Sequence, residues 1–170
     1  ERTRIVCMSP PSYETCVIGV ALTRVGAFSI WIDPAVGYRN VAERLSRVKP
    51  EAFLGNALAH LGRITFGWGP RNLRKLVLAG SPLVPGGRII KGFPPFPGAR
   101  SIKSLRKHAP AEPQPPNVGP DDPCAVLYTT GSTGPAKPSL YLHRNFCQLF
   151  RNAHHSWRFD PDHEVPVDMA

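Results

Sequence analysis

The sequence predicts an α/β fold in which helices flank a mostly parallel sheet, and three observations support this class. From Arg4 to Leu78, short apolar or β-branched runs alternate with segments of helical period. A stretch rich in proline and glycine follows, and another apolar run then leads into a Gly/Ser/Thr-rich loop. Such alternation is typical of parallel strands joined by helical crossovers. We therefore expect a doubly wound sheet extended by a strand–loop–strand–helix unit.

The first two elements are expected at residues 4–8, a strand, and from Tyr13 onward, a helix. Ser12 can cap the helix because its hydroxyl can accept a hydrogen bond from a free N–H of the first turn. Gly26 is the expected end of the helix. Apolar residues at helical spacing should share one of its faces: Ile18, Ala21, Leu22 and Val25.

A second strand is predicted at residues 28–32, where an apolar run indicates burial on both faces. The next helix is expected to begin with Asn40 as its cap and Glu43 in capping-box register, and to stop at Pro50. Its buried stripe should contain Val41, Leu45 and Val48.

A (βα)₃β unit over residues 1–80 is completed by a strand at 52–54, a helix marked by Leu58, Leu61 and Ile64, and a strand at 75–78. Residues 81–123 are rich in glycine and proline and are predicted to be loop and linker. Within them, Ser101 is expected to cap a short helix that reaches His108.

Residues 124–159 are expected to form the strand–loop–strand–helix unit. The strands are predicted at 124–129 and 139–142, with the loop Thr130–Lys137 between them. The helix that follows carries apolar residues at helical spacing, which predicts a core stripe of Phe146, Leu149, Phe150, Ala153 and Trp157.

Composition excludes several classes of protein. The chain is 42% hydrophobic and 19% charged, which is typical of a globular protein. Its longest apolar run, residues 16–22, is far shorter than the ~18 residues that a membrane helix needs, so a cytoplasmic protein is expected. The four cysteines show no zinc-site spacing, and we expect them to be free, reduced and mostly buried thiols.

The formal net charge of +9 raises the question of a nucleic-acid partner. Its basic residues are scattered, however, and the two short clusters at 71–75 and 103–107 are not interleaved with aromatic side chains. A solvated or partner-facing surface is therefore favoured over nucleic-acid binding.

The segment YTTGSTGPAK, from Tyr128 to Lys137, carries the groups that a polyphosphate needs. Gly131 and Gly134 permit positive φ and a close approach of the backbone to an anion. Hydroxyl donors and one cation complete the set of candidate phosphate ligands: Thr129, Thr130, Ser132, Thr133 and Lys137. The spacing differs from that of a Walker A loop, and no G-x-G-x-x-G follows the first strand.

This segment, followed by His143 in HRNF, resembles the signature loop of the adenylate-forming superfamily of AMP-dependent synthetases and ligases. The stretches around GVALTRVGAFSIWIDPAVGYRN and PDDPCAVLYTTGSTG resemble the same family. The resemblance implies that residues 1–170 are part of a multi-layer N-terminal AMP-binding domain. It also implies that the loop binds ATP, with Mg²⁺ as the accompanying ion, and that a carboxylic acid is converted to an acyl adenylate with release of pyrophosphate.

The wording of WIDPAVGYRN, KPEAFLGNALAH and GPAK is similar to that of the olefin-pathway β-lactone synthetases and the long-chain fatty acyl-CoA synthetases. A long-chain acid, with β-lactone or CoA thioester as the final product, is therefore expected. Two other hypotheses stay open: a module that binds a phosphorylated ligand without catalysis, and an inactive remnant.

Some residues count against an intact site. Pro138 stands where the family normally has glycine, which removes an N–H beside the loop. His143 is interpreted as a capping or packing residue, and the acidic pair Asp121–Asp122 as turn and cap residues. We expect the 170-residue chain alone to be inactive, because it lacks the later motifs of the family, and we assign no catalytic residue or metal ligand in it.

Overall fold

A computed structural model describes residues 2–33, 38–70, 73, 75–80, 98–108, 116–129 and 137–157. The amino-terminal elements alternate as the sequence predicts: β1 (Arg4–Met8), α1 (Tyr13–Arg24), β2 (Phe28–Trp31), α2 (Tyr38–Val48), β3 (Ala52–Gly55), α3 (Ala57–Phe66) and β4 (Lys75–Leu78). The later elements are β5 (Ala99–Ser101), α4 (Ile102–Lys107), β6 (Pro123–Thr129), β7 (Lys137–Leu142) and α5 (His143–Trp157).

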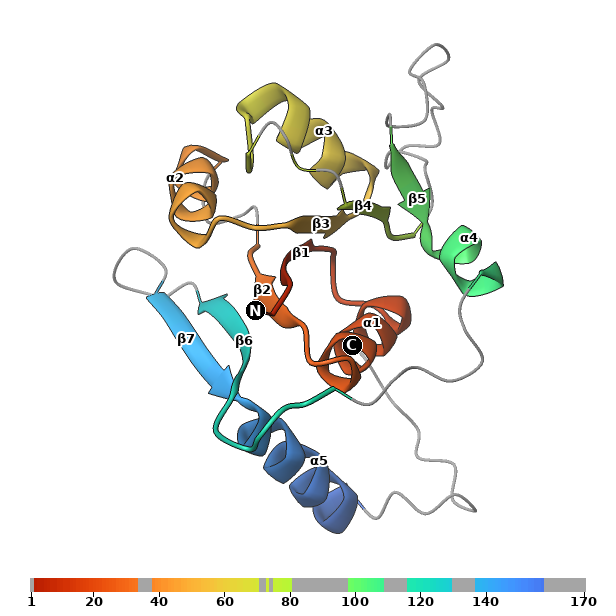
Figure 1. The fold of residues 1–170 in the computed structure, drawn as a ribbon, viewed down its shortest axis with the longest axis vertical. Coiled ribbons are helices and arrows are strands. Elements are labelled where there is room, and N and C mark those ends of the chain that lie inside the picture. The colour runs from red at the N-terminus through yellow and green to blue at the C-terminus, as the bar shows by residue number, and fades with distance from the viewer. Residues whose placement is uncertain are drawn as a thin grey trace.

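All seven described strands form one sheet in the order β5-β4-β3-β1-β2-β6-β7. Every neighbouring pair is parallel except β6–β7, which is antiparallel. Helices α2 and α3 lie on one side of the sheet, and α1 lies on the other (Figure 1). The predicted class, a mostly parallel sheet flanked by helices, is confirmed.

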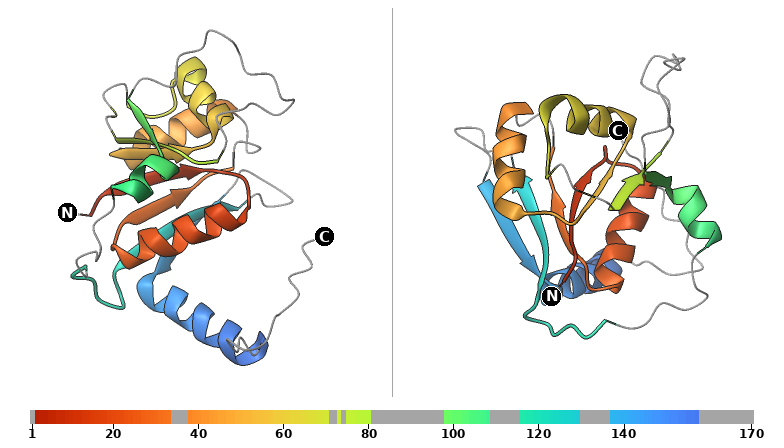
Figure 2. Two further views of the ribbon diagram at one scale, coloured as in Figure 1. Left: turned by 90° about the vertical axis from the view of Figure 1, so that its right-hand side faces the viewer. Right: turned by 45° about the horizontal axis from the view of Figure 1, so that its top comes forward.

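Alternate side chains of β1 pack in two separate cores, because successive side chains of a strand point to opposite faces of the sheet. Val6 and Met8 face α2 and α3 and belong to the larger core, which also contains Phe53, Val41 and Leu45. Cys7 faces the opposite side and packs in a smaller core with residues of α1, β3 and β4. Figure 2 shows α1 on this second side of the sheet, beside β2.

Local capping signals were predicted correctly for two helices. The Ser12 hydroxyl accepts a hydrogen bond from the Thr15 N–H, and the Ser101 hydroxyl accepts one from the Ser104 N–H. Asn56 caps α3 in the same way through the Ala59 N–H. These bonds satisfy backbone donors that a helix leaves free at its first turn.

Two sequence predictions about helices were wrong. The second helix was predicted to begin after Asn40 as its cap, but α2 begins at Tyr38, so Asn40 already lies in its first turn. The predicted face of α1 is only partly covered: Ile18 is buried, whereas Ala21 and Val25 are exposed. The predicted stripe of α2 is covered, because Val41 and Leu45 are fully buried.

Helix α5 also departs from the prediction. Leu149 is 60% exposed and Phe150 is 50% exposed, so the expected core stripe is not buried among the described residues. All four cysteines are free, but only Cys7 and Cys124 are buried, whereas Cys16 and Cys147 are exposed. In the described part of the chain, no helix is both long and apolar enough to cross a membrane.

Candidate functional site

The predicted phosphate loop joins two strands at one edge of the sheet. Thr129 is the last residue of β6, Lys137 is the first residue of β7, and the two are paired across the antiparallel ladder. The structure therefore brings the two ends of the loop together. The remaining candidates lie outside the described residues: Thr130, Gly131, Ser132, Thr133 and Gly134.

The end of β6 is held by its neighbours. Strand β6 pairs in parallel with β2, so its carboxyl end lies at the same edge of the sheet as those of β1, β2 and β3. Tyr128 packs against the larger core, and the guanidinium of Arg44 lies over its ring, 5.1 Å from the centroid. Tyr128, two residues before the loop, is thus held between strand and helix.

Lys137 and Pro138 lie at the other end of the loop. The Lys137 side chain is exposed, so its charge is available to solvent or to an anion. Pro138 lies on β7, the last strand of the described sheet, and is paired with Tyr128 of β6. A proline is tolerated on such a strand because its missing N–H does not interrupt an inner ladder.

A groove lies beside the end of β6, at the carboxyl edge of the sheet. Its volume is about 850 Å³, and it is lined by the β1–α1 turn, the ends of β1, β2 and β6, and helix α3. Strand β1 is followed by a helix on one side of the sheet and β3 by a helix on the other. The groove therefore lies at a topological switch point, where open α/β sheets usually bind their ligands.

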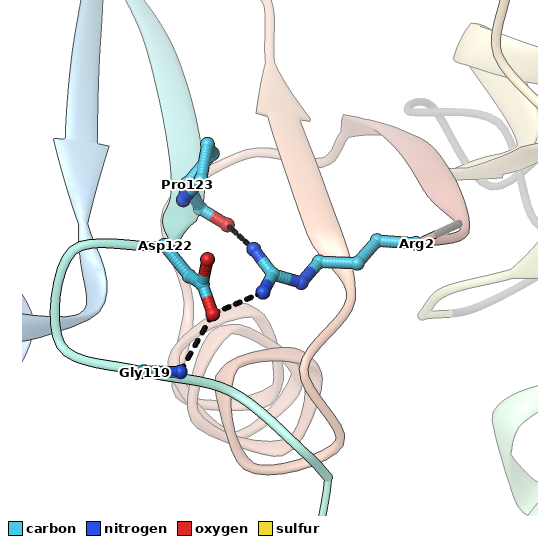
Figure 3. Close-up of polar contacts among 4 residues, drawn as sticks. All are labelled: Arg2, Gly119, Asp122 and Pro123. Carbon is cyan, nitrogen blue, oxygen red and sulfur yellow. Dashed lines mark hydrogen bonds and ion pairs between the residues drawn. The ribbon is translucent and has the colours of Figure 1, made fainter.

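The opposite edge of the sheet is fastened by Arg2 and Asp122 (Figure 3). The two side chains form an ion pair, and Arg2 also donates to the Pro123 carbonyl at 3.3 Å. The Asp122 carboxylate accepts a hydrogen bond from the Gly119 N–H at 2.6 Å. This bond, together with Arg2, lowers the pKa of Asp122, and the predicted turn role of Asp122 is confirmed.

His143 begins α5 at this same edge, away from the loop. Its backbone N–H donates to the Asp122 carbonyl at 3.0 Å, and its side chain is buried. Burial and the charge of Arg2 lower its pKa, so the neutral ring is favoured. This position supports a packing role for His143 rather than contact with the loop.

Sequence reasoning missed the groove, because the sequence does not show which face of α3 is covered. The three residues that mark α3 in the sequence do not face the sheet: Leu58 is 52% exposed, Ile64 is 47% exposed, and Leu61 is half-buried. The helix instead packs through Ala57, Ala59, His60 and Gly62. Of the three marker residues, Leu58 and Leu61 line the groove.

Among the residues that the structure describes, no group of three or more His, Cys, Asp or Glu side chains could hold a metal ion.

Strand β5 is a second feature that the sequence prediction missed. It is only three residues long and pairs with β4 within the region predicted as loop and linker.

The sequence profile of the AMP-binding enzyme family matches residues 1–169. An olefin beta-lactone synthetase from Stenotrophomonas maltophilia (strain K279a) is 34% identical over 143 residues, which cover 84% of this chain and 24% of that protein. A protein of the same name from Xanthomonas campestris pv. campestris is 34% identical over 153 residues, which cover 88% of this chain and 25% of that protein. The chain thus spans about a quarter of the length of these relatives.

Solved structures share the fold. The A domain of a carboxylic acid reductase from Segniliparus rugosus, in complex with AMP and a co-purified carboxylic acid, matches with a TM-score of 0.66 at 16% identity, over 97% of this chain and 28% of that chain. Apo MatB from Rhodopseudomonas palustris matches with a TM-score of 0.63 at 18% identity, over 95% of this chain and 28% of that chain. At these identities the matches establish the architecture.

Proposed function

Because the chain belongs to the AMP-binding enzyme family, we propose that it forms part of an enzyme that activates a carboxylic acid with ATP. The observation that carries this proposal is the pairing of Thr129 with Lys137 beside the groove at the carboxyl edge. It places the ends of a Gly/Ser/Thr-rich loop where an α/β sheet usually binds its ligand.

The loop residues are proposed to grip the β- and γ-phosphates of ATP. Thr129, Thr130, Ser132 and Thr133 offer hydroxyl donors, and Gly131 and Gly134 allow backbone N–H groups to face the anion. Lys137 adds a positive charge from the first residue of β7. The donor set of this segment fits a polyphosphate, since its two ends converge and its cation is exposed.

The proposed reaction is acyl adenylate formation. ATP, when bound, would supply the AMP group: a carboxylate oxygen forms a bond to the α-phosphorus, and the bond to the pyrophosphate oxygen breaks. Negative charge then grows on the departing pyrophosphate. Lys137 and the loop donors would stabilise that charge, because a cation and N–H or O–H donors directed at developing negative charge lower the barrier.

Magnesium is proposed as the ion that accompanies ATP in this reaction. The described residues contain no cluster of carboxylates for it, so we name no residue of this chain as its ligand. A cytoplasmic location likewise stays a prediction from the composition.

The second half of the reaction is proposed to be β-lactone formation on a long-chain β-hydroxy acid. In that step the β-hydroxyl oxygen attacks the acyl carbon of the adenylate, loses its proton and expels AMP. The two curated relatives carry the name olefin beta-lactone synthetase, which supports this product over a CoA thioester. A thioester would require the thiol of a bound CoA as the nucleophile.

Pyrophosphate exchange, product analysis and phosphate-ligand binding on the complete reading frame test these proposals. ATP–pyrophosphate exchange should depend on a long-chain acid and fall at least about 10-fold in Lys137→Ala, since a fixed cation is worth one or more factors of ten in rate. Product analysis with a β-hydroxy acid, with and without CoA, distinguishes lactone from thioester. Exchange that is unaffected by Lys137→Ala contradicts the role of the loop.

Phosphate-ligand binding without any exchange supports the non-catalytic module, and failure to bind or exchange supports an inactive remnant.

A further inference from the structure

The groove at the carboxyl edge has an apolar lining that the proposed phosphate loop does not use. Its walls include hydrophobic side chains from three separate segments: Pro10, Trp31, Leu58, Leu61, Phe66 and Trp68. Among the described residues that line it, Asp33 is the one charged side chain. A cavity of about 850 Å³ lies within the range of sites for small organic ligands, roughly 300–1,000 Å³.

Helix α3 contributes an unusual wall to this groove. Ala57, Ala59, His60 and Gly62 pack against the protein, so the larger apolar residues Leu58 and Phe66 are left about half exposed. Burying the larger side chains would normally stabilise the fold more than burying the small ones, because burial contributes about 25 cal/mol per Å² of apolar surface. The arrangement is therefore suited to an apolar ligand that covers these side chains.

The groove is continuous with the end of β6. Leu127 and Tyr128 form part of its lining, and the phosphate loop begins immediately after Thr129. An elongated molecule in the groove could thus keep its tail against α3 while its head group lies at the end of β6. Only an amphipathic ligand would use both the apolar lining of the groove and the polar segment that follows β6.

We propose that this groove binds the hydrocarbon tail of the carboxylic acid, with the carboxylate directed toward the end of β6. The inference rests on the proposed function and deepens it by placing the acyl chain against Leu58, Leu61 and Trp68. A polyanionic occupant such as CoA is disfavoured, because the charged side chain among the described lining residues is acidic.

Tryptophan fluorescence tests the proposal directly, because Trp31 and Trp68 line the groove. A Trp157→Phe background removes the tryptophan of α5, and the 170-residue chain is titrated without ATP with butanoate, octanoate or palmitate below their micelle concentrations. Palmitate should bind at least about 10-fold more tightly than octanoate, since each buried methylene adds to affinity. Affinity that does not depend on chain length, or the absence of saturable binding, overturns the proposal.

Two substitutions on the same helix provide a matched comparison. Leu58→Glu places a charge in the groove, and Ile64→Glu makes the same change at a similarly exposed position that does not line it. We expect Leu58→Glu to weaken palmitate binding at least about 10-fold and Ile64→Glu less than about 2-fold, because burying an unpaired charge against the tail is costly. Equal effects, with both variants folded by circular dichroism, contradict the assignment.

Crosslinking with a diazirine-bearing palmitate gives an independent readout. Labelled peptides should contain residues 57–66 or the β1–α1 turn, and excess CoA should not compete. Labelling elsewhere, or competition by CoA, overturns the proposal. Because these assays omit ATP, they can fail while Lys137-dependent pyrophosphate exchange persists, and the exchange can fail while tail binding persists.

Discussion

The guanidinium of Arg44 lies 5.1 Å from the centre of the Tyr128 ring and thereby connects helix α2 to the strand end that precedes the phosphate loop. Tyr128 is also packed against the larger core. A cation over an aromatic face is attracted by the negative potential of the ring. This contact therefore helps helix α2 to hold the end of β6 in place, just before the loop.

Arg44→Ala is expected to lower the free energy of unfolding by about 0.5–1 kcal/mol, and Arg44→Lys by less, because lysine retains a cation. Urea unfolding of both variants measures this. Arg47→Ala is the control: Arg47 is exposed on the same helix and forms an ion pair with Glu43, worth no more than about 0.5 kcal/mol. The contact has no stabilising role if Arg44→Ala matches wild type.

Gly26→Ala should destabilise the protein more than Gly67→Ala. Both glycines have positive φ, 67° and 65°, so alanine is strained at either position. A Cβ at Gly26 would also lie 2.7 Å from the Pro116 Cβ, whereas nothing lies within 4 Å of one at Gly67. We expect an additional cost of about 1–3 kcal/mol at Gly26, typical of overpacking. Equal urea midpoints for the two variants would show that residues 116–118 move away freely.

His60 should make stability fall as the pH is lowered. Burial lowers its pKa, the charge of Arg63 adds to this effect, and the hydrogen bond to the Val77 carbonyl opposes it. Below the ordinary pKa near 6.5, the unfolded chain therefore takes up a proton that the folded chain refuses. The stability is fully present above pH 6.5 and is lost as the pH falls toward the folded-state pKa.

Urea unfolding at several pH values, with wild type and His60→Gln, checks this expectation. The variant should show a shallower dependence on pH, with the remainder attributed to His143, whose pKa is also lowered by burial. Identical slopes for wild type and His60→Gln would contradict it.

Pro138→Gly should preserve or raise the adenylation rate of the complete reading frame. Pro138 is exposed opposite Tyr128, and glycine restores an N–H and backbone freedom next to the loop. Single-turnover kinetics with ATP and a long-chain acid measure the rate, with Lys137→Ala as the impaired reference. A clear decrease would mean that the proline is adapted to this site.

Local signals in the sequence predicted more of this fold than of its surfaces. Ser12 and Ser101 cap their helices as expected, because a cap depends on residues three positions away. Helical spacing also assigned Leu149 and Phe150 to the apolar stripe of α5, but it could not show whether other segments cover that stripe. Their exposure depends on segments distant in the sequence, which spacing does not report.

The candidate site divides in the same way. The order strand, loop, strand was predictable from residues 124–142, and β6 and β7 confirm it. The groove was not predictable, because it requires Pro10, Trp31 and Leu58 to meet from three segments. Neighbours in sequence determine local backbone structure, whereas a cavity depends on the packing of the whole sheet.

The pairing of β2 with β6 joins segments that are made at different stages of synthesis. The Ser29 hydroxyl donates to the Cys124 carbonyl at 3.4 Å, although the residues are 95 positions apart, and β2 has β6 as its outer neighbour. Until residues 123–129 leave the ribosome, β2 presents an unpaired edge that can template association with other chains. Chains that end before Pro123 should therefore aggregate at concentrations where the 170-residue chain stays monomeric, which light scattering can measure. The strand that leads into the loop thus also protects the nascent sheet.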